Sequence, residues 1–340
     1  MKSDRVTIID IAEALGTSSV SVSRALSGQT GVSPDLRDRI IRKASELGYK
    51  KLRKPGRPSI LVLHKTPYEK EHPNFSSKAQ GLEKALQNAD MDYSMEFIEK
   101  INLDTLSLPF NISKGTAFDG VILIGRFPSA YADFISARIP NVIFYTGYTP
   151  AHSYDCVWYN FNRAGYMQCR HLINHGHKDI AFAGDNTSYK NREKLLGITT
   201  ALEGSGLPLR QEYLIDPAAS SAPGDILDSL KRTFRIPTAI ICEHDHTAVS
   251  LIRLLHDKKL KVPGDISIIG YGNSEISAIS IPSLTTVDPD IEYACEAVAA
   301  LLERKISRPG KPAENIMISG KIIERESVRA LCPAIIKSIK

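Results

Sequence analysis

The stretch VTIIDIAEALGTSSVSVSRALSG, residues 6–28, decides the fold of the first part of this chain. Thr7 is a preferred helix N-cap, and apolar residues follow it at the spacing of one helical face, namely Ile8, Ile11, Ala12 and Leu15. Gly16 is suited to end this helix. After the turn Thr17-Ser18, the pattern predicts a second short helix that is closed by Gly28 and buries Val22, Ala25 and Leu26.

The outer face of this second helix is composed mostly of small polar side chains. It carries Ser19, Val20, Ser21, Ser23 and Arg24. Small side chains let a helix approach base edges closely, and an arginine can bond guanine or a phosphate through two N–H groups. Two short helices joined by a tight turn match the geometry of a helix-turn-helix. The pattern predicts a DNA-binding head, and the alternative is a three-helix packing module without a ligand.

A third helix is expected after Ser33-Pro34, which form a suitable N-terminus. Its predicted buried stripe consists of Leu36, Ile40, Ile41, Ala44 and Leu47.

Basic residues are concentrated at the start of the chain. Residues 1–60 hold 12 Lys and Arg against 6 Asp and Glu, whereas the remaining 280 residues hold 31 against 32. Part of the excess is the run Lys50, Lys51, Arg53, Lys54 and Arg57. Such a local basic footprint neutralises DNA phosphates and makes binding salt-dependent. A solvated charge run is the alternative, and its place directly after a helix-turn-helix favours the DNA interpretation.

The remaining composition limits the class of protein. With 340 residues and 42% hydrophobic content, the chain can form a small head and a large core. The five cysteines, Cys156, Cys169, Cys242, Cys295 and Cys332, show no paired metal spacing and are expected to be free thiols. The start MKSDRVTI has no apolar signal core, and no run is long enough to span a bilayer. We expect a cytoplasmic protein without a metal, a cofactor or a membrane partner.

From residue 59, short apolar strands alternate with helical stretches, which is typical of a parallel sheet wound by helices. The predicted strands are Ile60–His64, Tyr93–Ile98, Gly120–Ile124, Val142–Tyr145, Ile180–Ala183, Ala239–Cys242 and Ser267–Gly270. The series restarts near residue 160. The pattern therefore predicts two doubly wound α/β subdomains with a cleft between them, where ligands bind beyond the carboxyl ends of the strands.

A series of motifs follows in a specific order along the chain. After residues 6–28 come VSPDLRDRIIRKASELGY, HPNFSSKAQGLEKAL, FDGVILIG, HLINHGHKDIAFAGD, PTAIICEHDHTA, VPGDISIIGYG, PSLTTVDP and ERESV. With these motifs the chain resembles the lactose-repressor (LacI/GalR) family of transcription regulators over nearly its whole length. The resemblance implies a homodimer on a palindromic operator of double-stranded DNA. It also implies a periplasmic-binding-protein-like core whose cleft holds a small effector, commonly a sugar.

The resemblance also implies domain boundaries and DNA-reading residues. It places a head at residues 1–50, a linker at 51–58 and a core at 59–340. In the core, subdomain 1 takes about 59–158 plus 288–316, and subdomain 2 takes about 161–285 plus 319–340. The family's base-reading pair falls on Ser19 and Val20, and its arginine falls on Arg24. The set expected to contact DNA in the head is Thr7, Ser18, Ser19, Val20, Ser23 and Arg24.

The linker departs from the family pattern. Relatives usually form a short hinge helix there, but this segment, KKLRKPGRPS, is some four residues shorter, and its prolines and glycine disfavour a helix. Lys54, Gly56 and Arg57 instead lie in a sequence that resembles an AT-hook core, in which an extended Gly-Arg-Pro enters a narrow A·T minor groove. The alternative is a plain tether whose charges touch phosphates.

The expected effector pocket departs as well. Asn160 stands where relatives usually carry an aspartate, Lys194 replaces an arginine three residues before Gly197, and His244 replaces an asparagine. Gly272 stands in place of an aspartate. Because acceptors for sugar hydroxyls are lost while cationic donors remain, we expect an anionic effector such as a sugar acid or sugar phosphate. The expected set is Phe75, Arg126, Asn160, Arg192, Lys194, His244 and Asn273, and the alternative is a pocket that has lost its ligand.

Other residues favour structural interpretations. His171, His175 and His177 have a loose metal spacing, but no cysteine or carboxylate completes a set nearby, so a structural role is favoured. The aromatic residues Tyr145, Tyr148, Trp158 and Tyr159 could stack on a ligand ring or belong to the core.

Two rival classes share this α/β fold, namely enzymes and extracytoplasmic binding proteins. The late glycines in GYGNS do not form G-x-G-x-x-G, and the chain has no phosphate-binding loop and no G-x-S-x-G elbow. We therefore expect no enzymatic activity, and the helix-turn-helix disfavours the second rival.

Overall fold

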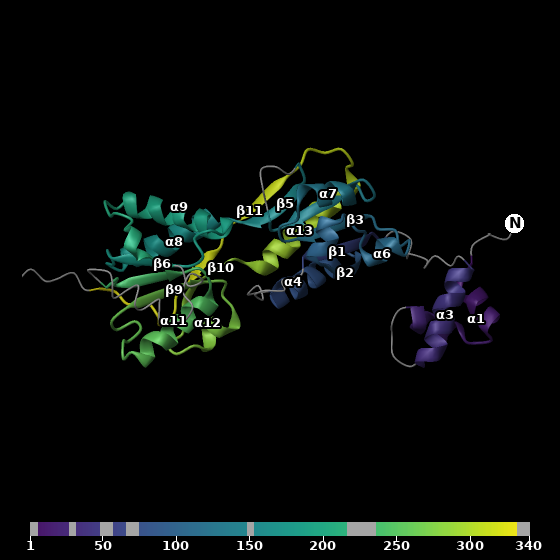
Figure 1. Ribbon diagram of the computed structural model, residues 1–340, viewed down its shortest axis with the longest axis horizontal. Helices are drawn as coiled ribbons and strands as arrows, with labels where there is room; N and C mark the ends of the chain where they lie inside the picture. The colour runs from purple at the N-terminus through teal and green to yellow at the C-terminus, as the bar shows by residue number, and fades with distance from the viewer. Residues whose placement is uncertain are drawn as a thin grey trace, which may run out of the picture. The chain divides into compact units, whose positions relative to one another are not determined.

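The computed structural model describes residues 6–26, 32–47, 57–65, 75–147, 153–215 and 236–331. The chain forms two compact units, residues 1–57 and residues 58–340 (Figure 1). In the described ranges, no helix combines the length and apolar character needed to cross a membrane.

The first unit is a three-helix head. It contains α1 (Ile8–Leu15), α2 (Ser19–Leu26) and α3 (Pro34–Glu46). The helices enclose a small core made of Ile11, Ala12, Val22, Ala25, Ile40 and Ala44. This confirms the predicted helices and most of their buried positions.

Interactions between residues close in sequence define both ends of α1, as predicted. The Thr7 Oγ1 accepts a hydrogen bond from the Asp10 N–H at 3.4 Å, and the Asp10 carboxylate accepts one from the Thr7 N–H at 2.6 Å. Gly16 ends the helix in the left-handed conformation with φ 62°. The predicted burial of Ile41 is wrong, because its side chain is 48% exposed. Ile40 is fully buried, and the next residue is turned by about 100° around the helix. Gly28 lies outside the described residues.

The second unit contains two sheets, and the first has the strand order β11-β5-β4-β3-β1-β2. All its described strand pairs are parallel. The strands are β1 (Ser59–Lys65), β2 (Asp92–Ile98), β3 (Gly120–Ile124), β4 (Val142–Tyr145), β5 (Asp155–Tyr159) and β11 (Asn315–Ile318). One face packs against α4 (Phe75–Asn88) and α13 (Ile291–Ser307), and the other packs against α5 (Lys100–Asp104) and α7 (Ser129–Ser136) (Figure 1). Together with α6 (Phe110–Ser113), these elements form the first lobe.

The second sheet has the order β12-β10-β9-β8-β6-β7. Its strands are β6 (Ile180–Ala183), β7 (Leu214–Ile215), β8 (Ala239–Cys242), β9 (Ser267–Tyr271), β10 (Thr285–Asp288) and β12 (Lys321–Ile323), and β12 is antiparallel to β10. Helices α8 (Phe161–Asn174) and α9 (Tyr189–Glu203) cover one face, and α11 (Asp245–Asp257) covers the other. With the turn η1 (Gln211–Tyr213) and α12 (Glu275–Ile279), they form the second lobe.

The two lobes confirm the predicted α/β architecture of two doubly wound subdomains. Every predicted strand is present, but β5, β7, β10, β11 and β12 were not among them. Strands β7 and β12 have only two and three residues, and β11 alternates between exposed and half-buried positions before its last residue. These strands are too short or too polar to stand out by periodicity.

The chain passes between the lobes at three places that lie beside one another. Ile318 at the end of β11 pairs with Tyr159, and the Asn160 N–H donates to the Ile318 carbonyl at 2.8 Å. Asp288 pairs with Lys321, and a Cβ on Gly320 would lie 2.2 Å from the Asp288 carbonyl oxygen. The three crossing segments therefore form one continuous band.

Helices α8 and α9 approach each other closely at two glycines. A Cβ on Gly165 would lie 2.1 Å from the Lys194 carbonyl oxygen, and a Cβ on Gly197 would lie 1.9 Å from the Asn162 carbonyl oxygen. Because both neighbours are helix backbone, only glycine fits at these positions without displacing a helix.

We expect Gly197→Ala to destabilise the core by about 1 to 3 kcal/mol, since the added methyl group forces α8 and α9 apart. The measurement is urea unfolding followed by circular dichroism. Gly204→Ala is the matched control at the end of the same helix, where the nearest atom to an added Cβ is 3.2 Å away. Equal stability of the two variants would contradict this account of the crossing.

Candidate nucleic-acid interface and ligand cleft

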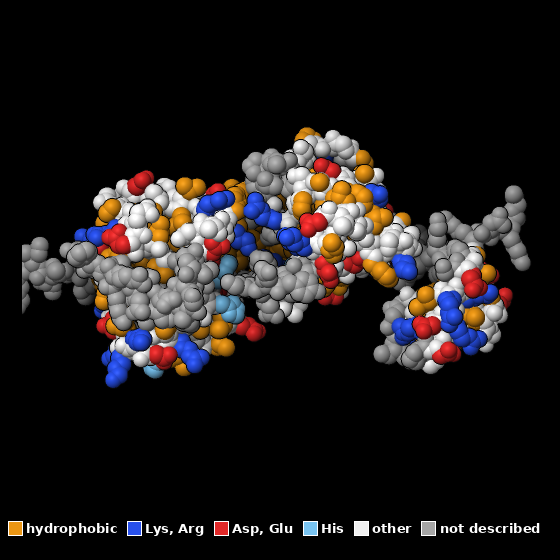
Figure 2. Space-filling model, viewed as in Figure 1, with side chains coloured by type: hydrophobic (Ala, Val, Ile, Leu, Met, Phe, Trp, Pro, Cys, Tyr) orange, Lys and Arg blue, Asp and Glu red, His pale blue; other side chains and the backbone are white. Residues whose placement is uncertain are grey.

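The outer face of α2 is exposed as predicted. Val20 is 58% exposed, and Ser19 and Arg24 are also exposed, whereas Val22 is fully buried on the opposite side. The Ser18 Oγ accepts the Ser21 N–H at 3.0 Å and thereby stabilises the start of the helix. In Figure 2, Lys and Arg side chains gather on the visible face of the head.

Some predicted DNA contacts cannot be placed. Lys54 and Gly56 lie outside the described residues, as does the side chain of Ser23. Arg57 is described and half-buried. The Thr7 hydroxyl also donates to the Asp10 carboxylate at 2.8 Å, so the helix cap already uses it.

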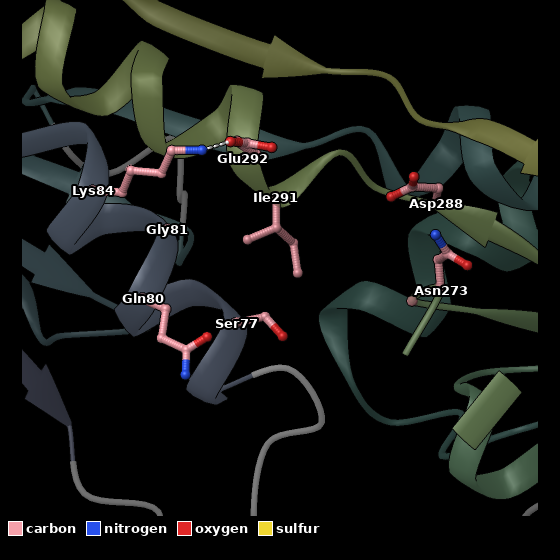
Figure 3. A pocket seen from close by; sticks show the side chains of 9 residues that line it. Ser77, Gln80, Gly81, Lys84, Asn273, Asp288, Ile291 and Glu292 are labelled. Atoms are coloured by element: carbon pink, nitrogen blue, oxygen red, sulfur yellow. Dashed lines mark hydrogen bonds and ion pairs between the residues drawn. The ribbon is translucent and has the colours of Figure 1, made fainter. Parts of the chain in front are cut away.

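A pocket of about 350 Å³ lies between the two lobes of the core. Figure 3 shows Ser77 and Gln80 of α4 on one side and Asn273 and Asp288 of the second lobe on the other. Lys84 and Glu292 form an ion pair at this pocket, and both side chains are more than half exposed. The lining combines polar groups with apolar surface such as Ile291, and its polar groups suit a hydroxylated ligand.

Beside this pocket, α9 contributes the fully buried Lys194, and α4 contributes the half-buried Lys78. The Lys194 side chain is fully buried, and its Nζ donates to the Glu243 carbonyl at 2.5 Å and lies 3.8 Å from the centre of the Tyr271 ring. Burial lowers the pKa of Lys194 to about 7, and the charge of Glu243 only partly opposes this. Burial and the charge of Lys190 likewise lower the pKa of Lys78 to about 7. The Lys78 Nζ lies 5.8 Å from the centre of the Tyr159 ring.

A row of aromatic rings connects the two lobes beneath these lysines. The ring centres of Tyr145 and Tyr159 are 6.3 Å apart, those of Tyr159 and Phe161 are 6.3 Å apart, and those of Phe161 and Tyr271 are 5.8 Å apart. The hydroxyls of Tyr145 and Tyr159 are hydrogen-bonded at 2.7 Å. Tyr145 and Tyr159 are buried, which confirms the core interpretation for them, and Tyr148 lies outside the described residues.

The structure brings Lys194 and His244 together around the Tyr271 ring. The ring centres of His244 and Tyr271 are 6.4 Å apart. Asn273 lies two residues beyond Tyr271, and its Oδ1 accepts from Arg325 at 2.7 Å. The Asn160 amide oxygen instead caps α8 by accepting the Arg163 N–H at 2.8 Å.

The other expected effector residues are more dispersed. Arg126 is exposed after β3, and its guanidinium lies 5.7 Å from the centre of the Tyr189 ring in the other lobe. Arg192 is exposed on α9, unlike the buried Lys194. Phe75 begins α4, and its side chain is outside the described residues.

Sequence reasoning missed Lys78 and Lys190. Lys190 precedes Lys194 by four residues, so the two share one face of α9. The sequence could therefore have predicted that Lys190 lies near Lys194. It gave less indication for Lys78, because the position of Lys78 near the other lobe depends on how α4 packs.

The acidic side chains near the lysines already have donors in the protein. The Glu243 carboxylate accepts from the Asn191 amide at 2.5 Å and from the Asp185 N–H at 3.3 Å. The Asp245 carboxylate accepts from Ser274 at 2.8 Å and from the Thr286 hydroxyl at 2.5 Å. The charges of both carboxylates act to raise the pKa of Lys194, against the larger effect of burial.

The histidines have structural contacts. The buried His177 ring is hydrogen-bonded to the Thr238 hydroxyl at 3.0 Å and to the Arg329 carbonyl at 3.1 Å. Burial lowers the pKa of His177 to about 4. Over the described ranges, no group of three or more His, Cys, Asp or Glu side chains could hold a metal ion.

Comparisons with known proteins agree with the fold. Residues 169–328 match a periplasmic binding protein-like domain. Over 202 residues, 58% of the chain, the sequence is 35% identical to the HTH-type transcriptional repressor PurR of Actinobacillus pleuropneumoniae serotype 3 (strain JL03). This match spans only 60% of that repressor's length.

Two further matches cover nearly the whole chain. Catabolite control protein A of Priestia megaterium is 26% identical over 348 residues, which cover 95% of this chain and 99% of that protein. The solved structure of the lac repressor dimer bound to operator and the anti-inducer ONPF has a TM-score of 0.68 at 20% identity, covering 96% of this chain and all of that one. The chain is similar to regulators of the LacI/GalR family.

Lys194→Met provides a test of the buried charge. Because the pKa of Lys194 is about 7 in the folded chain and that of an unfolded lysine is about 10.4, the unfolded chain binds more protons between these values. The free energy of unfolding of the wild type, relative to the variant, should therefore rise from pH 7 to pH 10, by at most about 1.4 kcal/mol per pH unit. Chemical denaturation at a series of pH values measures this difference.

The matched control is Lys258→Met, which removes an exposed lysine at the end of α11. Its difference from the wild type should not change with pH. If the free energy of unfolding of the wild type relative to Lys194→Met does not change with pH, burial does not lower the pKa of Lys194.

Proposed function

We propose that this protein is a sequence-specific transcriptional regulator, acting as a repressor of carbohydrate-related genes, that responds to a small effector held between the lobes of its core. The observation that carries the proposal is one chain that joins a helix-turn-helix head to a two-lobed α/β core with a polar interlobe pocket. This combination favours a regulator over an enzyme or an extracytoplasmic binding protein, because neither rival needs a DNA-reading head.

In the proposed DNA complex, α2 lies in the major groove. Ser19 offers a hydroxyl to base edges, the exposed Val20 contacts a thymine methyl, and Arg24 bonds guanine or phosphate. Ser18 and Ser23 supply nearby phosphate contacts, and Thr7 instead caps α1 through Asp10. Two such heads in a homodimer read a palindromic operator with half-sites about one helical turn apart. The protein acts in the cytoplasm, on the nucleoid.

The proposed effector is an anionic sugar derivative. Lys194 and His244 lie together at the Tyr271 ring, and their nitrogen groups are suited to an anionic ligand. A ligand that binds one arrangement of the lobes better than another shifts the population toward that arrangement. The change in the lobes then alters the spacing of the two heads on DNA.

A gel shift tests the proposal as a whole. Duplexes are selected by the purified protein from genomic fragments, and their binding is compared with that of bulk competitor DNA. The proposal expects a fragment that is retained at competitor concentrations that release random DNA. If no fragment is retained in this way, with or without metabolite extract, the protein is not a sequence-specific regulator.

Arg24→Ala should weaken binding to the selected operator by about 1 to 3 kcal/mol and weaken binding to random DNA much less, because a base contact is lost along with one charge. Arg39→Ala removes an exposed arginine from α3 and is the control, with a similar loss expected on both DNAs. Titrations at fixed salt measure both. An equal loss on operator and random DNA for Arg24→Ala would refute the base contact.

For the linker, we propose that Lys54, Gly56 and Arg57 enter a narrow A·T minor groove, as an AT-hook does. Methylation at adenine N3, which lies in the minor groove, should then interfere with binding beside each half-site. Arg57→Ala should abolish this interference. If only guanine N7 methylation in the major groove interferes, the linker is a plain tether.

A further inference from the structure

We propose that Arg126 of the first lobe and Tyr189 of the second form a latch that holds the lobes together on the side away from the band of crossing segments. The guanidinium carbon of Arg126 lies 5.7 Å from the centre of the Tyr189 ring, within the range of a cation–π contact. Arg126 thereby acts on the arrangement of the lobes, whereas the sequence predicted a contact with the effector. This role goes beyond the proposed function and does not depend on the identity of the ligand.

The backbone at Arg126 has a fixed position in the first lobe. Arg126 follows Gly125, which comes directly after β3, and the Gly125 N–H donates to the Tyr145 carbonyl at 3.1 Å. A Cβ on Gly147 would lie 2.2 Å from the Gly125 carbonyl oxygen and 2.8 Å from the Arg126 nitrogen, so two backbone segments touch here. The next residue, Phe127, is buried in the core of this lobe. The exposed Arg126 side chain therefore extends from a rigid base.

Tyr189 has a similarly fixed position in the second lobe. It is the first residue of α9, and the Ser188 Oγ caps this helix by accepting the Asn191 N–H at 3.3 Å. The close backbone contacts at Gly165 and Gly197 hold α9 against α8. The two partners of the contact therefore stand on elements that move with their own lobes.

The strand order places this contact away from the band. In the first sheet, β3 lies two positions from β5, the strand that leads into the second lobe. In the second sheet, β6, which precedes Tyr189, lies three positions from β10. Because neighbouring strands are about 4.8 Å apart, the contact lies about 10 to 14 Å from the band. A rotation of the lobes by about 10° about the band moves the partners about 2 Å apart, beyond the reach of about 6 Å of a cation–π contact.

The latch is weak enough to open. Arg126 is exposed and Tyr189 is half-buried. A cation–π contact at an exposed site changes an equilibrium by about two- to five-fold. A ligand with a modest preference for one arrangement of the lobes can therefore override it. The latch increases the closed fraction of the ligand-free core and leaves both arrangements populated.

Distances between the lobes test the latch. Nitroxide labels on Ala130→Cys and Leu196→Cys, in the full chain with Cys332→Ser, report the separation of α7 and α9 by double electron–electron resonance. Both labelled positions are exposed, whereas the four cysteines of the described ranges are buried and are not expected to react. The labelled parent chain should show a shorter and a longer distance, which correspond to the closed and open arrangements.

Loss of either partner should favour the longer distance. Arg126→Gln and Tyr189→Ala are each expected to lower the ratio of closed to open chains about two- to five-fold. The double variant should shift this ratio no further than either single variant does, because both changes remove the same contact. Tyr189→Phe keeps the aromatic ring and should leave the ratio unchanged.

Arg138→Gln is the matched control. It removes an exposed arginine whose guanidinium carbon lies 4.2 Å from the centre of the Phe134 ring, and both of these residues belong to the first lobe. A cation–π contact and a positive charge are lost, but the ratio of closed to open chains should not change. If Arg126→Gln and Tyr189→Ala behave as Arg138→Gln does, or if the parent chain shows one distance that no variant alters, the latch does not exist.

Discussion

The close approach of α8 to α9 is the contact on which the cleft depends. Two glycines leave space for the neighbouring helix backbone at Lys194 and Asn162, so α9 has essentially one position relative to α8. That position places the buried Lys194 over the Tyr271 ring, beside the cleft. A glycine-dependent backbone contact thus fixes the position of the buried Lys194.

Buried charged side chains in the core have two different kinds of environment. In the first lobe, the fully buried Asp155 accepts hydrogen bonds from Lys305, Lys311 and the Glu314 N–H. Burial alone would raise the pKa of Asp155, but these donors hold it below its usual value. The cleft lysines lack such a set of partners among the described residues, and their pKa values fall instead. Buried charges with ionic partners are typical of structural roles, whereas titratable groups with strongly shifted pKa values in a cleft are candidates for a binding site.

Sequence reasoning predicted best where local chemistry determines the structure. The Thr7 cap, the Gly16 end and the alternation of strands and helices depend on neighbours along the chain, and all were found. It failed at Ile41, because this residue is turned by about 100° from the fully buried Ile40 and so leaves the buried face of α3. It also missed β10, β11 and β12, which are short and gain their partners from distant parts of the chain. Lys78 was missed for the same reason, since its environment is created by tertiary packing.

The band formed by the three crossing segments has a mechanical consequence. Backbone pairing joins Tyr159 to Ile318 and Asp288 to Lys321, and Gly320 lies against the Asp288 backbone. Segments bonded in this way resist sliding past one another, but a narrow ribbon can twist and bend. The lobes are joined by this one band. When the band bends, the lobes rotate relative to each other and do not slide past each other.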